Sequence, residues 1–152
     1  AARRFKNAPV RFDVVGPIGI TEQAMADAPS SVTFHGRVPR DDAASWYERA
    51  DVFVLPTLSD GFAITQLEAM AHGLPVIATP RCGRVVSDGE NGLIIPVRDS
   101  SALANALASL IEAPDCIEAM SHRALQTARR FSMDHIASSL LDAMSSLDRV
   151  SS

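Results

Sequence analysis

The sequence has few cysteines and no clustered histidines. Only Cys82 and Cys116 occur among the 152 residues, and they form no Cys-x-x-Cys pair. This spacing offers neither a framework of disulfide bonds nor a thiol ligand set for a metal. The four histidines, at positions 35, 72, 122 and 135, share no metal-ligand spacing. We therefore expect no bound metal, no cofactor and a reducing, cytoplasmic location.

The sequence also lacks long apolar runs and an excess of basic residues. Apolar runs such as residues 52–55 and 93–95 are far shorter than the ~20 residues that span a bilayer. The opening Ala-Ala-Arg-Arg leads into no apolar segment of a signal peptide. The formal net charge is -4, so we expect no nucleic-acid partner and no transmembrane segment. Any anion that the protein binds has to be held by a local site.

No repeat, low-complexity tract or Ser/Gly-rich linker divides the chain. A length of 152 residues therefore predicts a single domain, residues 1–152. The chain begins without Met, just before its first predicted strand, and we expect it to be a fragment of a longer protein.

Short apolar segments alternate with longer amphipathic ones. The short segments predict strands at residues 10–16, 32–36, 51–56, 75–79 and 92–96. Apolar residues at helical spacing predict helices at residues 21–28, 41–49, 62–72, 100–112, 115–130 and 133–147. This alternation is typical of an α/β fold, here a Rossmann-like, doubly wound parallel sheet with a helical C-terminus. Trp46 and Tyr47 are predicted to pack one helix on the sheet.

Ligands of such sheets bind beyond the carboxyl ends of the strands, so the loops there are candidate sites. The loop after residue 56 carries Asp60 and Gly61 before a predicted helix, whose free N–H groups and dipole suit a phosphate. Glu68 follows Asp60 by eight residues. Along a continuous helix that spacing is about 12 Å, comparable to the extent of a nucleotide sugar.

The same residues also fit a surface helix without a ligand. Asp60 is a natural N-cap. Polar side chains form one helical face and apolar ones the opposite face: Thr65, Glu68 and His72 against Ile64, Leu67 and Ala71. From the pattern alone, a solvated face and a binding site are about equally good explanations.

Residues 59–78 carry a longer pattern, Ser-Asp-Gly-Phe-Ala-Ile-Thr-Gln-Leu-Glu-Ala-Met-Ala-His-Gly-Leu-Pro-Val-Ile-Ala. This string resembles the signature of group 1 glycosyltransferases, the family-four enzymes of GT-B fold. Their usual form is Glu-Gly-Phe-Gly, then Leu-Glu-Ala-Met-Ala, then Gly-x-Pro-Val-Ile. The likeness continues in residues 34–38, 47–56, 85–96 and 131–132. A match over nearly the whole chain is far more specific than any tripeptide within it.

The resemblance implies the donor-binding half of a two-domain enzyme that transfers a sugar from a nucleoside diphosphate with retention of anomeric configuration. Asp60 and Glu68 match the two acids of the family's Glu-x7-Glu motif, the first as a catalytic group near the transferred sugar and the second at the donor ribose. The other implied contacts are the N–H groups of Gly61, Phe62 and Ala63 to sugar hydroxyls, those of Ile64 and Thr65 to the diphosphate, Gly16 facing the diphosphate, and Arg37 and Val38 flanking the nucleobase. Oriented dipoles there stabilise charge on the leaving diphosphate.

The sequence departs from the family pattern at several positions. Asp60 is one methylene shorter than the usual Glu, and Ala63 replaces a glycine. Met133 stands where the family often has tryptophan, which we interpret as core packing. The loop after residue 79 has Pro-Arg-Cys-Gly-Arg in place of Gly-Gly-x-Pro-Glu. Arg81 in this loop is a candidate donor-phosphate ligand, although an exposed arginine is the commoner explanation.

The resemblance also implies two parts that would precede this segment. One is a first strand with Gly-Arg-Leu and Lys-Gly, whose Arg and Lys clamp the donor diphosphate; the other is an N-terminal domain with the site for a sugar, lipid or other acceptor. We therefore predict no transferase activity from this chain alone and weak donor binding at best.

Two alternatives remain at this stage. A non-catalytic Rossmann-like module for nucleotide binding or interaction is one, and Asp60 and Ala63 favour it slightly. A phospho-receiver is the other, but the sequence shows no acidic cluster with a partner lysine. No motif specifies the nucleotide, the sugar or the acceptor, or whether the parent enzyme rests on the inner face of a membrane.

Overall fold

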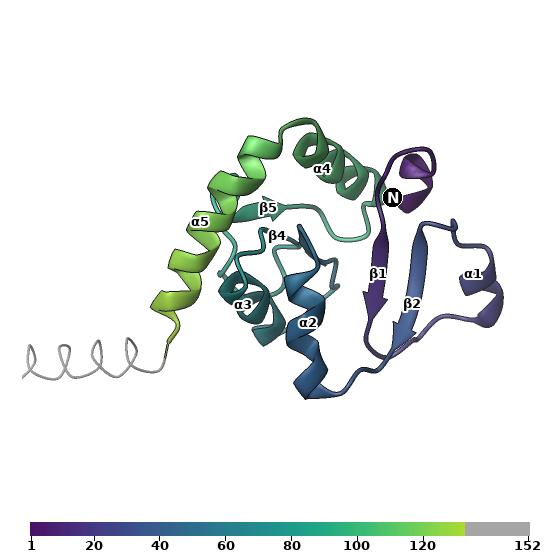
Figure 1. Ribbon diagram of the computed structural model, residues 1–152, viewed down its shortest axis with the longest axis horizontal. Helices are drawn as coiled ribbons and strands as arrows, with labels where there is room; N and C mark the ends of the chain where they lie inside the picture. The colour runs from purple at the N-terminus through teal and green to yellow at the C-terminus, as the bar shows by residue number, and fades with distance from the viewer. Residues whose placement is uncertain (133–152) are drawn as a thin grey trace, which may run out of the picture.

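The structure of the chain is a computed structural model that describes residues 1–132 (Figure 1). The predicted helix 133–147, with Met133, lies outside the described residues. Two 3-10 helices occur, η1 (Ala2–Phe5) and η2 (Arg40–Asp42). The strands are β1 (Phe12–Val15), β2 (Val32–Gly36), β3 (Phe53–Leu55), β4 (Val76–Ala78) and β5 (Gly92–Ile94). The α-helices are α1 (Glu22–Ala26), α2 (Ala43–Glu48), α3 (Ile64–Ala71), α4 (Ser100–Glu112) and α5 (Pro114–Arg130).

Two elements have the predicted bounds, and most others are shorter. β2 and α4 match the prediction, whereas the predicted strands 10–16 and 51–56 are confined to β1 and β3. The predicted helix 41–49 divides into η2 and α2. α5 begins one residue early, because Pro114 is well suited to the first turn of a helix, where its missing N–H is not needed.

The strands form two parallel sheets rather than one continuous sheet. β1 pairs with β2 in the first, with Phe12 opposite Val32. β4 lies between β3 and β5 in the second, with Ile77 opposite Val54 and Leu93. Within residues 1–132 no hydrogen-bonded ladder joins the two sheets. The predicted α/β class with parallel strands and a helical C-terminal part is confirmed, and within the described residues the parallel strands are divided between two sheets.

Helices cover both faces of the second sheet, as predicted. Phe53 and Leu55 of β3 pack against a cluster around Met70 of α3. The alternate residues of this segment, Val52 and Val54, pack against a cluster on the other face that includes Leu107 of α4. This alternation places hydrophobic core on each side of the sheet.

Side chains, rather than backbone hydrogen bonds, join the two sheets. Trp46 of α2 packs against His35 of β2 with ring centroids 4.2 Å apart, and the next residue, Tyr47, meets Phe53 of β3 edge-on at 5.8 Å. The predicted packing of this helix by Trp46 and Tyr47 is confirmed. Phe12 of β1 also packs against the cluster on the α4 side.

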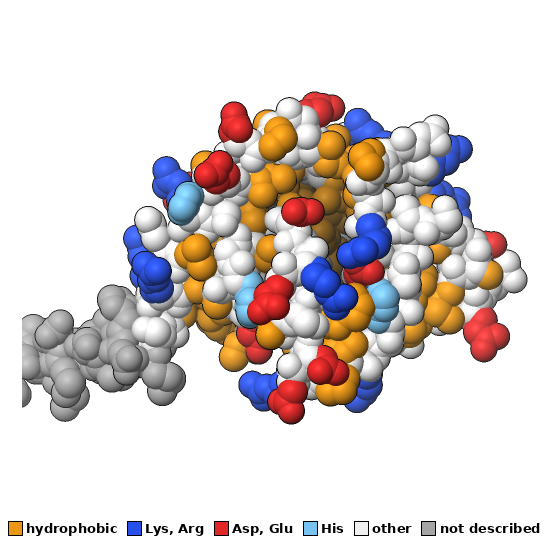
Figure 2. Space-filling model, viewed as in Figure 1, with side chains coloured by type: hydrophobic (Ala, Val, Ile, Leu, Met, Phe, Trp, Pro, Cys, Tyr) orange, Lys and Arg blue, Asp and Glu red, His pale blue; other side chains and the backbone are white. Residues whose placement is uncertain are grey.

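The first sheet leaves apolar side chains uncovered. Val14 and Val15 of β1 are 40% and 39% exposed. On the face seen in Figure 2 the molecule is hollowed between α4 and the N-terminal elements, and hydrophobic side chains line the hollow. Among the described helices, none is both long and apolar enough to cross a membrane.

Candidate functional site

The loops that follow β3 and β4 lie against each other. The Asp60 N–H donates to the Arg81 carbonyl oxygen at 2.8 Å. Gly83 has a φ of +78°, and a Cβ at that position would lie 3.4 Å from the ring of Phe62. Because β3 and β4 are neighbours in a parallel sheet, their carboxyl ends bring two of the candidate loops into one site.

Gln66 of α3 fastens both loops to the helix. Its side chain is fully buried, and its Nε2 donates to the carbonyl oxygens of Phe62 and Cys82. Gln66 Oε1 has no hydrogen-bond partner within the described residues. Sequence reasoning missed this residue, and the available signal was a glutamine inside an otherwise apolar helical face.

The buried face of α3 differs from the predicted one. Gln66, Ala69 and Met70 are buried, whereas Ile64 is 62% exposed and Ala71 is exposed. The predicted apolar face is therefore wrong for Ile64 and Ala71. The physical reason is that the Gln66 amide satisfies two backbone carbonyl groups, which makes its burial favourable despite its polarity.

Asp60 organises the turn before α3. Its Oδ1 accepts from the N–H groups of Phe62 at 3.2 Å and Ala63 at 2.7 Å. Ala63 has φ +50° and ψ +72°, the left-handed region, and α3 begins only at Ile64. Asp60 therefore lies in a loop, and the spacing of about 12 Å expected for a continuous helix does not apply. The carboxylate stabilises this turn, but the N-cap of α3 is Ala63, so the prediction of Asp60 as the N-cap is wrong; Asp60 Oδ2 has no partner among residues 1–132.

The end of α3 nearest Asp60 presents N–H groups without acceptors. Within the described part of the chain the N–H groups of Gly61, Ile64 and Thr65 are among them. The first N–H groups of a helix have no intrahelical partner and lie at the positive end of its dipole. The N–H groups of Phe62 and Ala63, predicted to hold sugar hydroxyls, donate to Asp60 in this structure.

Glu68 lies one turn farther along α3 and is half-buried. The Tyr47 hydroxyl donates to Glu68 Oε2 at 3.1 Å. Burial, together with the negative charge of Glu68 and this hydrogen bond, raises the pKa of Tyr47 to about 12. At neutral pH the phenol is therefore the donor and the carboxylate the acceptor. Sequence reasoning predicted the packing of Tyr47 but missed this contact, because the two residues are 21 positions apart.

Comparisons with known proteins identify the family of the chain. Residues 1–113 match the sequence profile of the family described as "Glycosyl transferases group 1". The chain belongs to this family. Among curated group 1 relatives, the chain is 34% identical over 113 residues to the D-inositol 3-phosphate glycosyltransferase of Streptomyces griseus, covering 73% of this chain and 24% of that protein. The corresponding enzyme of Corynebacterium urealyticum is 36% identical over 111 residues, covering 72% of this chain and 26% of that protein. The chain thus spans about a quarter of the length of these relatives.

Solved structures show the same fold at lower sequence identity. Sucrose-phosphate synthase from Thermosynechococcus elongatus superposes with a TM-score of 0.77 at 24% identity, covering 97% of this chain and 41% of that one. HepE from Anabaena, solved in complex with UDP, superposes with a TM-score of 0.76 at 24% identity, covering 95% of this chain and 43% of that one. The α/β architecture is therefore one that the chain shares with these two solved structures.

The other predicted residues of the group 1 pattern lie on the first sheet. Gly16, with φ +132°, ends β1, and its N–H donates to the Gly36 carbonyl oxygen at 2.8 Å. Arg37 and Val38 follow β2 directly, the first exposed and the second half-buried. The loops after β1 and β2 thus adjoin each other, as do the loops after β3 and β4. Within residues 1–132 no hydrogen bond connects the first two loops to the second two.

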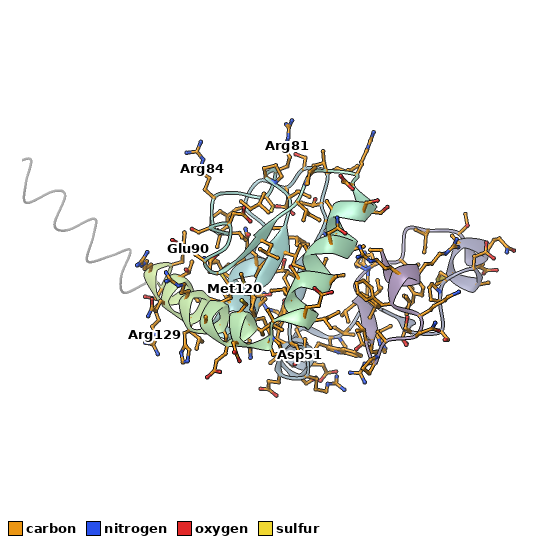
Figure 3. All side chains as sticks on the ribbon, turned by 90° about the horizontal axis from the view of Figure 1, so that it is seen from above. Asp51, Arg81, Arg84, Glu90, Met120 and Arg129 are labelled. Atoms are coloured by element: carbon orange, nitrogen blue, oxygen red, sulfur yellow. The ribbon has the colours of Figure 1, made fainter. Side chains whose placement is uncertain are left out.

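Arg81 lies at the edge of the group 1 site. Its backbone carbonyl holds the Asp60 loop, but its side chain is exposed and projects away from the molecule, as does that of Arg84 (Figure 3). Neither guanidinium group forms an ion pair with another described residue.

A cavity of ≈ 240 Å³ lies near these loops, between the carboxyl ends of the second sheet and the start of α4. Neither Asp60 nor Glu68 lines it. Its one carboxylate, Asp99, already accepts from the N–H groups of Ser101 and Ala102 as the cap of α4. Arg98 and Ser100 also line the cavity, whereas the free N–H groups and the two acidic residues of the family pattern lie on or just before α3. No group of three or more potential metal ligands occurs among the described residues.

Proposed function

We propose that the chain holds the nucleoside-diphosphate sugar donor in an enzyme that transfers the sugar to an acceptor. The observation that carries the proposal is the start of α3, where free N–H groups adjoin two carboxylates, Asp60 and Glu68, that have unused oxygens. Phosphate oxygens need donors and sugar hydroxyls need acceptors, and this arrangement supplies both. Family membership supports it, as do the structures of HepE in complex with UDP and with UDP-glucose.

The two carboxylates have separate roles in this proposal. Glu68 accepts hydrogen bonds from the hydroxyls of the donor ribose. Asp60 Oδ2 accepts from the transferred sugar and serves as the catalytic carboxylate, while Oδ1 keeps the turn in place. The Phe62 and Ala63 N–H groups reach sugar hydroxyls only if they leave Asp60, so Gly61, whose N–H is free, makes the first contact with the sugar.

The diphosphate binds at the free N–H groups of Ile64 and Thr65, with the dipole of α3 behind it. As the bond between the sugar and the diphosphate breaks, negative charge grows on the leaving oxygen. Fixed N–H dipoles aimed at that oxygen stabilise the charge without having to reorient. Gly16 faces the diphosphate from the first sheet, Arg37 and Val38 flank the nucleobase, and Arg81 turns inward to a donor phosphate. Transfer proceeds with retention of anomeric configuration and without a metal or cofactor.

The rest of the enzyme is supplied by chain beyond this segment. The family resemblance implies a further strand, and among residues 1–132 the unpaired edges of β1 and β3 are places where such a strand could add to a sheet. The acceptor site belongs to a separate N-terminal domain. We therefore expect no sugar transfer by the 152-residue chain alone, and detection of transfer to any acceptor by the purified chain would overturn this part of the proposal.

Nuclear magnetic resonance of the isotope-labelled chain tests donor binding. We expect millimolar UDP, ADP or GDP to shift the backbone amide signals of residues 61–68, because these groups surround the proposed diphosphate and ribose positions. Glu68→Gln should weaken the response, whereas Ser109→Ala, an exposed hydroxyl deletion on α4, should leave it unchanged. If none of the three nucleotides moves these signals, the chain does not bind the donor as proposed.

A further inference from the structure

Tyr47, the only tyrosine in the chain, has a ring that is fixed from two sides. Phe53 of β3 meets it edge-on with centroids 5.8 Å apart, and His72, which directly follows α3, stacks on it at 5.4 Å with an interplanar angle of 26°. A tyrosine has only two rotatable side-chain bonds, so these contacts determine where its hydroxyl points. That hydroxyl meets Glu68 Oε2, one turn before His72.

The direction of this hydrogen bond is also fixed. An ionised carboxylate only accepts, and burial beside the Glu68 charge raises the pKa of Tyr47 to about 12, so the phenol stays protonated at neutral pH. The bond occupies one lone-pair position on Oε2. Within residues 1–132 no other group donates to Glu68, so the remaining positions on both oxygens are available to a ligand.

We infer that Tyr47 is a positioning residue that orients the Glu68 carboxylate to accept two neighbouring hydroxyl groups of the donor ribose. The inference rests on the ribose role of Glu68 in the proposed function. A glutamate on a helix otherwise rotates about three side-chain bonds, and ordering it on binding costs conformational entropy. The Tyr47 hydroxyl holds the carboxylate in place before the nucleotide arrives, which lowers the cost of binding.

If Tyr47 has only a structural role, it joins α2 to α3, and removing its hydroxyl does not change which ligand the chain prefers. A positioning Tyr47 affects only the part of the affinity that depends on the ribose hydroxyls. The two roles therefore differ in how the chain distinguishes a nucleoside diphosphate from its dideoxy analogue, which lacks both hydroxyls.

The experiment compares the wild-type chain with Tyr47→Phe, Glu68→Gln and the control Ser109→Ala. Affinities are measured by magnetic resonance titration for UDP, ADP and GDP and for the dideoxy analogue of each. We expect the wild type and Ser109→Ala to prefer the hydroxylated nucleotide. Tyr47→Phe keeps the ring but removes the hydroxyl. It should lower the affinity for the hydroxylated nucleotide about fivefold, which corresponds to about one hydrogen bond, and leave the affinity for the dideoxy analogue unchanged. Glu68→Gln should reduce the preference at least as much.

Each outcome decides between the two roles. A Tyr47→Phe chain that keeps the full preference overturns the positioning role while donor binding stands. A wild type that binds none of the nucleotides, or binds both forms equally, refutes the ribose role of Glu68 and the inference with it.

An alkaline titration of phenolate absorbance in the intact chain provides a second readout. Its midpoint should be near 12 in the wild type and lower, but still raised by burial, in Glu68→Gln. An unchanged midpoint would mean that the hydrogen bond between Tyr47 and Glu68 is absent in solution, which also overturns the inference.

Discussion

Replacing Ala63 with glycine should stabilise the chain, although glycine usually destabilises the structure it enters. Ala63 has φ +50°, in the left-handed region, which costs an L-residue about 1–2 kcal/mol. Glycine relieves this strain but increases the entropy of the unfolded chain, at a cost of about 0.4–1 kcal/mol. At the middle of these two ranges, about 1.5 and about 0.7 kcal/mol, the difference is a net stabilisation of about 0.8 kcal/mol.

The same chemical change elsewhere is the control. Ala119 is exposed in the middle of α5, where a change to glycine should destabilise the chain by about 1 kcal/mol. Urea unfolding followed by circular dichroism and Trp46 fluorescence measures both variants. With a slope of about 2 kcal/mol per molar urea, the midpoint should rise by about 0.4 M for Ala63→Gly and fall by about 0.5 M for Ala119→Gly.

The decisive result is that the change from alanine to glycine raises the urea midpoint at position 63 and lowers it at position 119. A midpoint for Ala63→Gly that falls as far as that of Ala119→Gly would refute the left-handed conformation of Ala63 in solution. The turn held by Asp60 would then have to be different as well, because the Asp60 carboxylate bonds the Ala63 N–H in this conformation.

Two further predictions concern the core and the thiols. A Cβ on Gly92 would lie 2.0 Å from the Val76 carbonyl oxygen, so Gly92→Ala should lower the free energy of unfolding by about 1–3 kcal/mol. The control Gly19→Ala, whose added Cβ would have no neighbour within 4 Å, should change this free energy little. Equal urea midpoints for the two variants would contradict the prediction. Cys82 is 1% exposed and burial raises the pKa of its thiol, whereas Cys116 is exposed. Iodoacetamide should therefore label Cys116 first and Cys82 only after unfolding. Equal labelling rates of the two cysteines by mass spectrometry would refute the burial of Cys82.

Helical and strand periodicity identified the elements well where local signals are strong. β2 and α4 have the predicted bounds, and α4 has a capping carboxylate, Asp99, directly before its first residue. The start of α3 was predicted two residues too early, at Phe62. Alanine favours helices, so helical periodicity does not indicate that Ala63 takes a positive φ, although the family pattern has glycine at this position; in the structure Asp60 accepts a hydrogen bond from the Ala63 N–H.

Contacts between distant segments account for the other differences. Gln66 shares a helical face with Ala69 and Met70, but a polar side chain is not expected in the core; its bonds to two carbonyl groups, one from each loop, keep it buried. The pairing of Tyr47 with Glu68 likewise depends on how α2 lies against α3. Alternating strands and helices also do not specify which strands share hydrogen bonds, so the separation of β1 and β2 from the other strands was not predicted.

The division into two sheets has a thermodynamic consequence for the proposed donor. Gly16, Arg37 and Val38 lie on or beside the first sheet, whereas Glu68 and the free N–H groups lie beside the second, and within residues 1–132 the two sheets are joined by side-chain packing and the connecting backbone, without a shared ladder. A nucleotide that contacts both sets of residues acts as a crosslink between the sheets. By mass action its binding free energy is added to the stability of their association, so donor binding and the rigidity of the domain are linked in a single equilibrium.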